Sequence, residues 1–198
     1  MSNRHIWGDA MRVVAGKRKG HPLKAVPGEK TRPTTDKVKE AVFQSIGPFF
    51  DGGNVLDLFA GSGSLGIEAL SRGMDKAIFV DKHSKAIHTI KENLKAVKLE
   101  NQAEVYKNDA LRAIKILAKR RTAFDLILID PPYQLLDYTL LVEELMGLGL
   151  IKEGGIIYCE HDPEDDIPME TEQLKVLNKK NYGKTIAVTI YQFHEEGV

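Results

Sequence analysis

The sequence predicts an α/β protein with a mostly parallel seven-stranded sheet, helices on both faces and an antiparallel C-terminal strand. From residue 54 onward, short apolar runs rich in β-branched residues alternate with amphipathic helical segments. This alternation is typical of parallel strands joined by crossover helices. A glycine-rich hexapeptide, Gly61-Ser62-Gly63-Ser64-Leu65-Gly66, separates the first run from the first helix. A strand, a glycine loop and a helix in that order predict a cofactor site at the carboxyl edge of the sheet.

The expected elements follow from length, β-branched content and the period of the apolar residues. Strands are predicted over 55–59, 77–80, 103–106, 124–129 and 155–159. Helices are predicted over 65–71, 84–99, 110–117 and 135–146. Two further runs, 174–181 and 185–193, lie on either side of Gly183 and predict a C-terminal antiparallel pair. The acidic stretch 160–166 is expected to be a flexible loop beyond the fifth strand, in preference to a metal cluster, and such a loop could border the substrate cleft.

We expect one domain over residues 1–198, in which 1–34 form a basic N-terminal hairpin extension. Strand-like runs at 12–15 and 23–26 lie on either side of a tripeptide, Lys17-Arg18-Lys19, that reads as a hairpin tip between two glycines. Thr34 or Thr35 is a favoured N-cap for the helix that follows. That helix has an apolar face between residues 38 and 46 and ends at Gly47-Pro48.

Composition predicts a cytoplasmic protein. The 198 residues are 42% hydrophobic and 28% charged, as in ordinary globular proteins. No apolar run approaches the roughly 18 residues of a membrane span, and residues 1–10 lack the apolar core of a signal peptide. The single cysteine, Cys159, excludes an internal disulfide and lies in an apolar run, which favours a buried structural thiol over a catalytic one.

The formal net charge of zero conceals a basic N-terminal region. Residues 1–40 contain ten basic and four acidic side chains, a balance of +6, so the remaining 158 residues carry −6. A basic arm on an acidic body suits a polyanionic partner that contacts one face. A solvated basic loop explains the same charge about equally well.

The glycine loop is compatible with two cofactor classes. With Asp81, twenty residues after Gly61, the loop matches the dinucleotide fingerprint, so a nicotinamide oxidoreductase is one hypothesis. Asp57, four residues before Gly61, favours the other class. A carboxylate at that strand end repels a pyrophosphate and attracts a cationic amino-acid group. S-adenosylmethionine carries an ammonium and a sulfonium and has no phosphate.

The tetrapeptide Asp130-Pro131-Pro132-Tyr133 follows the buried run 124–129 and predicts methylation of an exocyclic amine on a nucleic-acid base. Such an amine is a poor nucleophile because its lone pair is delocalised into the ring. The Asp130 carboxylate and the Pro131 carbonyl can each accept an N–H bond and stabilise the positive charge that develops. Pro132 helps to fix the backbone, and Tyr133 can stack on the base. The structural alternative is a proline turn packed on an aromatic ring.

Four sequence blocks resemble known methyltransferases. Residues 56–63 resemble the cofactor loop of Rossmann-like S-adenosylmethionine-dependent methyltransferases, and residues 130–133 resemble the Asp/Asn-Pro-Pro-Tyr/Phe signature of amino-group methyltransferases. Asp130 stands where many adenine-N6 and protein-glutamine members have asparagine. Residues 12–20 and 31–43 resemble the bacterial 16S ribosomal RNA guanine-N2 methyltransferase family, and the same order of blocks covers most of residues 11–160.

The resemblance implies a cytoplasmic enzyme that methylates a guanine N2 in small-subunit ribosomal RNA, either free or in an assembling particle. It implies S-adenosylmethionine as cofactor, no metal and no membrane; a monomer is the default expectation. The implied cofactor residues are Asp57, Ala60, Gly61, Ser62, Gly63, Asp81, Asp109, Ala110, Arg32 and Thr34. The implied catalytic residues are Asp130, Pro131, Pro132 and Tyr133. The expected RNA contacts are Lys17, Arg18, Lys19 and Lys24.

Some roles have simpler explanations, and three other functions stay open. A strand-end turn is the less favoured explanation for Asp81, whereas capping of the helix that follows explains Asp109 equally well. The protein could instead methylate another RNA or DNA base at adenine N6 or cytosine N4. It could be an NAD-dependent oxidoreductase, or a non-catalytic RNA-binding module that retains the fold.

Overall fold

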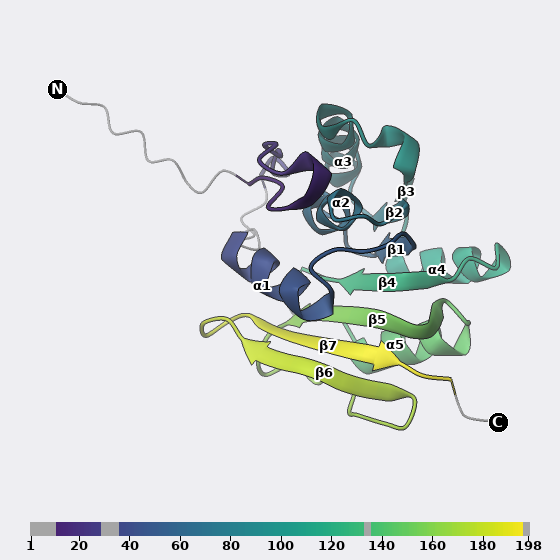
Figure 1. Ribbon diagram of the computed structural model, residues 1–198. Helices are drawn as coiled ribbons and strands as arrows, with labels where there is room; N and C mark the ends of the chain where they lie inside the picture. The colour runs from purple at the N-terminus through teal and green to yellow at the C-terminus, as the bar shows by residue number, and fades with distance from the viewer. Residues whose placement is uncertain (1–10, 29–35, 133–135, 196–198) are drawn as a thin grey trace.

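The fold is a single seven-stranded sheet in the order β3-β2-β1-β4-β5-β7-β6, seen in a computed structural model (Figure 1). The structure describes residues 11–28, 36–132 and 136–195. β1 to β5 run parallel, and β7 is antiparallel to both neighbours, β5 and β6. The predicted architecture, including the antiparallel C-terminal strand, is therefore confirmed.

The observed elements follow the predicted alternation closely. The strands are β1 (Asn54–Asp57), β2 (Lys76–Asp81), β3 (Ala103–Lys107), β4 (Phe124–Ile129), β5 (Ile151–His161), β6 (Leu174–Asn181) and β7 (Ala187–Phe193). The helices are α1 (Asp36–Ile46), α2 (Ser64–Ser71), α3 (Ser84–Val97), α4 (Ala110–Lys119) and α5 (Tyr138–Gly147). Short 3-10 turns occupy Gly16–Arg18 and Glu100–Gln102.

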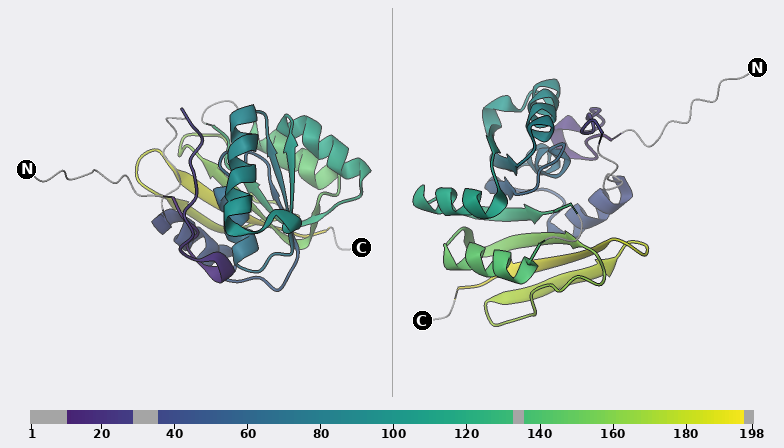
Figure 2. Two further views of the ribbon diagram at one scale, coloured as in Figure 1. Left: turned by 90° about the horizontal axis from the view of Figure 1, so that it is seen from above. Right: turned by 180° about the vertical axis from the view of Figure 1, so that it is seen from behind.

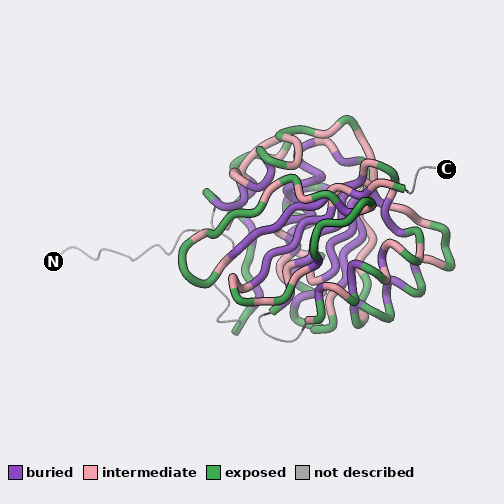
Figure 3. Tube along the Cα trace, turned by 90° about the horizontal axis from the view of Figure 1, so that it is seen from below, coloured by how far each residue is buried: buried purple, intermediate pink, exposed green. Residues whose placement is uncertain are grey.

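Two hydrophobic cores lie on the two faces of the sheet, because successive strand residues point to opposite sides. In β4, Leu126 and Leu128 pack with α1, α2 and α3, whereas Ile127 and Ile129 pack with α4 and α5. The view from behind in Figure 2 shows α4 and α5 covering the second face. The central strands β1 and β4 are mostly buried, whereas β3 and β6 at the edges of the sheet are more exposed (Figure 3). Burial on both faces explains why β4 is a continuous apolar run.

β5 is longer than predicted, and this corrects the interpretation of residues 160 and 161 as part of a flexible loop. Glu160 and His161 are 5% and 2% exposed and pair with Val188 and Ala187 of β7. The His161 ring also contacts the Thr189 hydroxyl at 2.9 Å. Pairing with β7 therefore extends the strand through residues whose polarity predicted a loop.

The N-terminal segment, residues 11–28, forms a hairpin with very little strand structure. The two strands predicted at 12–15 and 23–26 reduce to one antiparallel bridge between Arg12 and Pro22, supplemented by backbone bonds such as Leu23 N to Met11 O at 2.8 Å. The turn rests on α2: a Cβ added to Gly16 would lie 1.9 Å from the Ser71 carbonyl oxygen. Contacts with α2 and α3 replace a strand ladder here.

Candidate active site

A pocket of about 450 Å³ opens at the carboxyl edge of the sheet. Its lining residues include Asp57 and Asp81, at the ends of β1 and β2, Asp130 directly after β4, and Glu160 near the end of β5. β1 and β4 are neighbours whose connections leave in opposite directions, so the pocket lies at the switch point of the sheet, where ligands bind in open α/β folds.

Asp57 places a buried carboxylate at the base of the pocket. It is 1% exposed, and its Oδ2 accepts a hydrogen bond from the Gly66 N–H at 3.0 Å. Burial raises the pKa of Asp57 to about 7; the Gly66 bond opposes this shift, and the nearby Asp81 charge adds to it. Gly66 makes the contact possible, since a Cβ there would lie 2.4 Å from the Phe79 ring and 3.1 Å from Asp57 Oδ2.

The cofactor loop, residues 60–64, is held against the end of β2. The Gly61 N–H donates to Asp81 Oδ2 at 2.9 Å, and the His83 N–H donates to Asp81 Oδ1 at 2.8 Å. Gly63 has a φ of +79° at the start of α2, a conformation that favours glycine. Ala60, Gly61 and Ser62 line the pocket as predicted, whereas Gly63 shapes the turn behind it.

The segment 108–110 reaches the pocket from the end of β3. Asn108, Asp109 and Ala110 all line the pocket. Asp109 is also the N-cap of α4, because its Oδ1 accepts the Arg112 N–H at 3.2 Å. Capping and a place in the pocket are therefore both observed for this residue.

Asp130 and Glu160 bring two carboxyl groups to the same side of the pocket. Burial raises the pKa of Asp130 well above its ordinary value, and the charges of Glu160 and Asp57 add to the effect. The Tyr158 hydroxyl donates to Glu160 Oε2 at 2.8 Å. Pro131 is buried and Pro132 exposed, and both line the pocket. Crowded, buried carboxylates fit a positively charged ligand, which would relieve their mutual repulsion.

Three predicted site residues lie outside the described residues: Arg32, Thr34 and Tyr133. Their roles stay predictions. Sequence reasoning also missed several lining residues, because they come together only in the fold. These are Met11, Ala25, Val26, Leu58, Phe59, Ser64, Leu65, Lys82, His83, Leu111 and Leu136. Glu160 also lines the pocket; it belongs to the stretch 160–166, for which a position bordering the substrate cleft was the weaker expectation. Asn108 was noted only because residues 108–110 resemble the segment that contacts adenine in S-adenosylmethionine-dependent methyltransferases.

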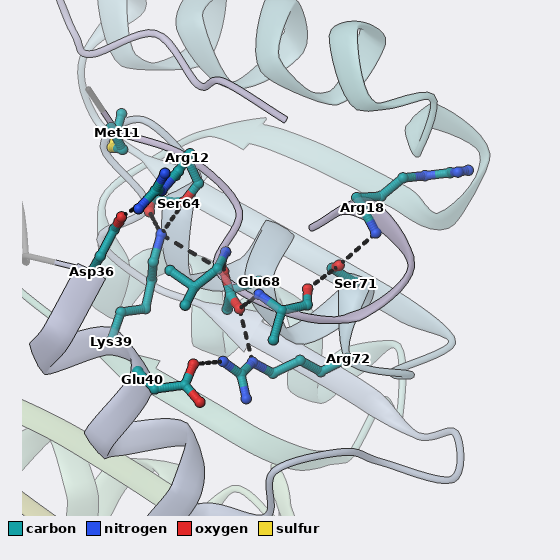
Figure 4. Close-up of polar contacts among 12 residues, drawn as sticks. Met11, Arg12, Arg18, Asp36, Lys39, Glu40, Ser64, Glu68, Ser71 and Arg72 are labelled. Carbon is teal, nitrogen blue, oxygen red and sulfur yellow. Dashed lines mark hydrogen bonds and ion pairs between the residues drawn. The ribbon is translucent and has the colours of Figure 1, made fainter. Parts of the chain in front are cut away.

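A cluster of buried charges holds the N-terminal segment on α2 (Figure 4). The two carboxylate oxygens of Glu68 accept the backbone N–H groups of Val14 and Ala15 at 2.8 and 2.9 Å. Arg72 Nε donates to the same carboxylate at 2.8 Å. The side chains of Lys39 and Glu68 are fully buried, and Lys39 Nζ lies 3.7 Å from Glu68 Oε2. Burial lowers the pKa of Lys39, although Glu68 opposes the shift.

The same segment is tied to the cofactor loop. Lys39 Nζ donates to the Arg12 carbonyl at 2.7 Å and to Ser64 Oγ at 3.0 Å. Asn93 of α3 donates to the carbonyls of Lys24 and Ser62 at 2.9 and 2.8 Å. The N-terminal segment is thus one wall of the pocket, attached to the loop that forms another.

The four predicted RNA contacts differ in their surroundings. Lys17 and Lys19 are exposed at the hairpin turn. Lys24 is exposed and forms an ion pair with Glu92 of α3 at 2.8 Å. Arg18 is anchored: its N–H donates to Ser71 Oγ at 2.9 Å, and its guanidinium contacts the Lys98 carbonyl at 3.4 Å. Lys17 and Lys19 therefore suit an external partner better than Arg18 does.

Within the described residues, no group of three or more His, Cys, Asp or Glu side chains is arranged to hold a metal ion. No helix in the same part of the chain is long and apolar enough to cross a membrane. Cys159 is fully buried in β5, and burial raises its pKa, as expected for a structural thiol.

A family model described as conserved hypothetical protein 95 matches residues 11–192. The chain belongs to this family. YlbH of Bacillus subtilis, a provisionally named rRNA methyltransferase, is 52% identical over 182 residues, covering 92% of this chain and 98% of that protein. Ribosomal RNA small subunit methyltransferase D of Haemophilus influenzae is 33% identical over 183 residues, covering 92% and 93% of the two chains. The family predicted from the sequence blocks is confirmed.

A solved structure agrees with this assignment to the conserved hypothetical protein 95 family. The provisionally named methyltransferase yhhF from Escherichia coli superposes with a TM-score of 0.80 at 29% identity. The match covers 94% of this chain and 99% of that chain. The Rossmann-like methyltransferase fold expected from the sequence is therefore confirmed over nearly the whole length.

Proposed function

We propose that this protein transfers a methyl group from S-adenosylmethionine to the exocyclic N2 amine of a guanine in small-subunit ribosomal RNA. The observation that carries the proposal is the group of carboxylates at the switch point of the sheet, contributed by Asp57, Asp81, Asp130 and Glu160. The named relatives support ribosomal RNA as the acceptor. The motif Asp130-Pro131-Pro132-Tyr133, which resembles the signature of amino-group methyltransferases, supports an amine as the reacting group.

The charge of the pocket favours a cationic cofactor over a dinucleotide. S-adenosylmethionine supplies an electrophilic methyl group on a sulfonium, next to an ammonium. Asp57 is the proposed partner of the ammonium, and Asp81 the proposed acceptor of ribose hydroxyls. Asn108 and Asp109 are the proposed contacts of adenine. A pyrophosphate would instead meet the Asp57 and Asp81 carboxylates and be repelled, which argues against a nicotinamide enzyme.

Asp130 and Pro131 are the proposed acceptors for the guanine amine. They line the same pocket as the proposed cofactor loop, so an amine held by them would share that pocket with the methyl donor. Acceptors aimed at the two N–H groups favour tetrahedral geometry at nitrogen and stabilise the cationic transition state. The proton leaves after the nitrogen has become acidic, so no strong base is required. Tyr133 is the proposed stacking partner of the base.

The proposed RNA-facing surface is the hairpin turn with Lys17 and Lys19, adjoining α3. Residues 11–28 contain five basic side chains and no acidic one. Such cations bind phosphates and orient RNA without reading its sequence. Lys24 lies where the N-terminal segment meets α3, and Arg18 contributes charge from its anchored position.

A methyl-transfer assay with labelled S-adenosylmethionine tests the function. Separate acceptors are unmodified small-subunit ribosomal RNA, the small-subunit particle, DNA and protein, with Asp130→Ala as the control enzyme. We expect label on the RNA or the particle and retained RNA binding without transfer by the variant. Label on DNA alone would contradict the RNA assignment. Tight NADH binding without affinity for S-adenosylmethionine would support the oxidoreductase instead.

A further inference from the structure

Asn93 connects three separate parts of the chain through one buried side chain. It lies on α3, is 1% exposed, and accepts the Lys24 N–H at 2.8 Å through Oδ1. Its Nδ2 donates to the Lys24 carbonyl at 2.9 Å and to the Ser62 carbonyl at 2.8 Å. The amide orientation follows from its partners, since an N–H needs the oxygen and two carbonyls need the nitrogen.

Both ends of the N-terminal segment are linked to the cofactor loop. Near residue 24, the Asn93 amide joins the segment to Ser62. Near residue 12, Lys39 Nζ joins the Arg12 carbonyl to the Ser64 hydroxyl. Ser62 and Ser64 line the pocket together with Met11, Ala25 and Val26 of the segment. A shift of the loop therefore displaces groups that fix the segment, or leaves buried polar atoms unpaired, which is costly.

We propose that Asn93 is a positioning residue that couples the cofactor loop to the RNA-facing N-terminal segment, so that cofactor and RNA each strengthen the binding of the other. The inference rests on the proposed function. A cofactor that orders residues 60–64 also orders Lys24 through the shared amide. RNA then binds a segment that the cofactor has already ordered, so RNA binding loses less conformational entropy. Coupling of this kind is reciprocal, so both ligands show the same factor, typically about 5–150-fold.

The test measures the dissociation constant of small-subunit ribosomal RNA with and without saturating S-adenosylhomocysteine. In the wild-type protein we expect the product to tighten RNA binding at least about fivefold, within the range usual for coupled sites. RNA should tighten product binding by the same factor. The coupling ratio is the RNA dissociation constant without product divided by that with product. In Asn93→Ala, and in the nearly isosteric Asn93→Asp, this ratio should approach one. Thermal melts monitored by circular dichroism establish that each variant is folded.

Lys24→Ala is the matched control. It removes the side-chain cation next to the Asn93 contact but retains the backbone N–H and carbonyl that Asn93 binds. RNA binding by this variant should weaken with and without product, while the ratio stays at the wild-type value. The coupling ratio is a readout that a purely structural role of Asn93 would leave unchanged.

Two results would overturn the inference without touching the proposed function. One is a folded Asn93 variant whose ratio of RNA dissociation constants equals that of the wild-type protein. The other is a ratio of one in the wild-type protein, if that protein methylates ribosomal RNA. The second result needs only the wild-type protein, so the inference can be tested even if the variants do not fold. A wild-type protein that neither binds nor methylates ribosomal RNA would overturn the proposed function, and the coupling with it.

Discussion

Two walls of the pocket are built in contrasting ways. The sheet-edge wall consists of the ends of β1, β2, β4 and β5, whose positions are fixed by parallel backbone pairing. The N-terminal wall, within residues 11–28, has one bridge of its own and depends on side chains from α1, α2 and α3. The groups proposed for chemistry lie on the wall that the sheet makes rigid. The groups proposed for RNA binding lie on a wall held by a small number of buried polar bonds.

The contrast predicts the largest energetic effect at Glu68. Replacing Glu68 by alanine leaves Lys39 and Arg72 buried without their shared carboxylate and removes the acceptor of two backbone N–H groups. Breaking a buried charge pair costs about 3–5 kcal/mol. We expect the free energy of unfolding, measured by urea denaturation, to fall by that amount.

Glu92→Ala is the control for Glu68→Ala. Glu92 pairs with Lys24 and, when the imidazole ring is protonated, with His88, and the Glu92 side chain is 39% exposed. Exposed pairs contribute about 0–1 kcal/mol, so this variant should be near wild type. Equal losses of unfolding free energy in the two variants would show that the buried cluster does not stabilise the N-terminal wall.

A substitution in the sheet-edge wall should lower the rate of methyl transfer. Asp130→Ala removes a proposed acceptor of the amine, and losing one such group typically lowers kcat by about 10²–10³-fold. Stopped assays of methyl transfer at saturating cofactor and RNA measure the effect. Affinity for S-adenosylhomocysteine, followed by calorimetry, should change much less. A variant with wild-type kcat would remove Asp130 from the proposed mechanism.

Cofactor affinity should depend on pH through Asp57. With a pKa of about 7, this carboxyl loses its charge as the pH falls from 8 to 6. The dissociation constant for S-adenosylmethionine should therefore rise up to about tenfold over that range. Asp57→Asn should bind weakly and without this dependence. If the dissociation constant of the wild-type protein does not change with pH, the assignment of Asp57 as the partner of the ammonium is contradicted.

The effect of pH on folding stability through Asp57 has the opposite sign to its effect on cofactor affinity. Because the pKa is raised on folding, from an ordinary value of 3.8, the ligand-free folded state binds more protons than the unfolded state. Asp57 should therefore make the protein less stable as the pH rises from about 4 to 7. Subtracting the pH profile of Asp57→Asn isolates this contribution.

The smallest effect is expected at the hairpin turn. Lys17→Ala with Lys19→Ala removes two exposed cations proposed to contact phosphates. RNA binding should weaken, and the slope of log K against log salt should flatten by about 1.4–1.8, if each cation contacts one phosphate. Lys115→Ala with Lys119→Ala, on the exposed side of α4, makes the same charge change on the other face of the sheet. Equal effects of the two pairs would indicate nonspecific attraction.

The two walls also differ in how far sequence could predict them. Asp57 was found because it lies at a strand end four residues before Gly61, and Asp81 because it follows the next apolar run, twenty residues after Gly61. Parallel strands bring such ends to one edge of the sheet. Glu160 was assigned to a loop because strand β5 continues through polar residues only by pairing with β7. Asn93 gave no local signal, since its partners Lys24 and Ser62 are 69 and 31 residues away.

The N-terminal strands were overpredicted for a related reason. The short strand-like runs at 12–15 and 23–26 suggested a ladder, but the backbone N–H groups of Val14 and Ala15 bind Glu68 instead of another strand. A buried glutamate on α2 is not an expected partner from sequence alone. The blocks at 12–20 and 31–43 nevertheless identified the relatives.

Nucleoside mass spectrometry after methyl transfer in vitro tests the central claim most directly. Unmodified small-subunit ribosomal RNA, free or in its particle, is incubated with the protein and S-adenosylmethionine and digested to nucleosides. The proposed function predicts N2-methylguanosine, absent with Asp130→Ala. N6-methyladenosine or N4-methylcytidine in its place would contradict the assigned base, and no methylated nucleoside from either substrate would contradict the enzyme itself.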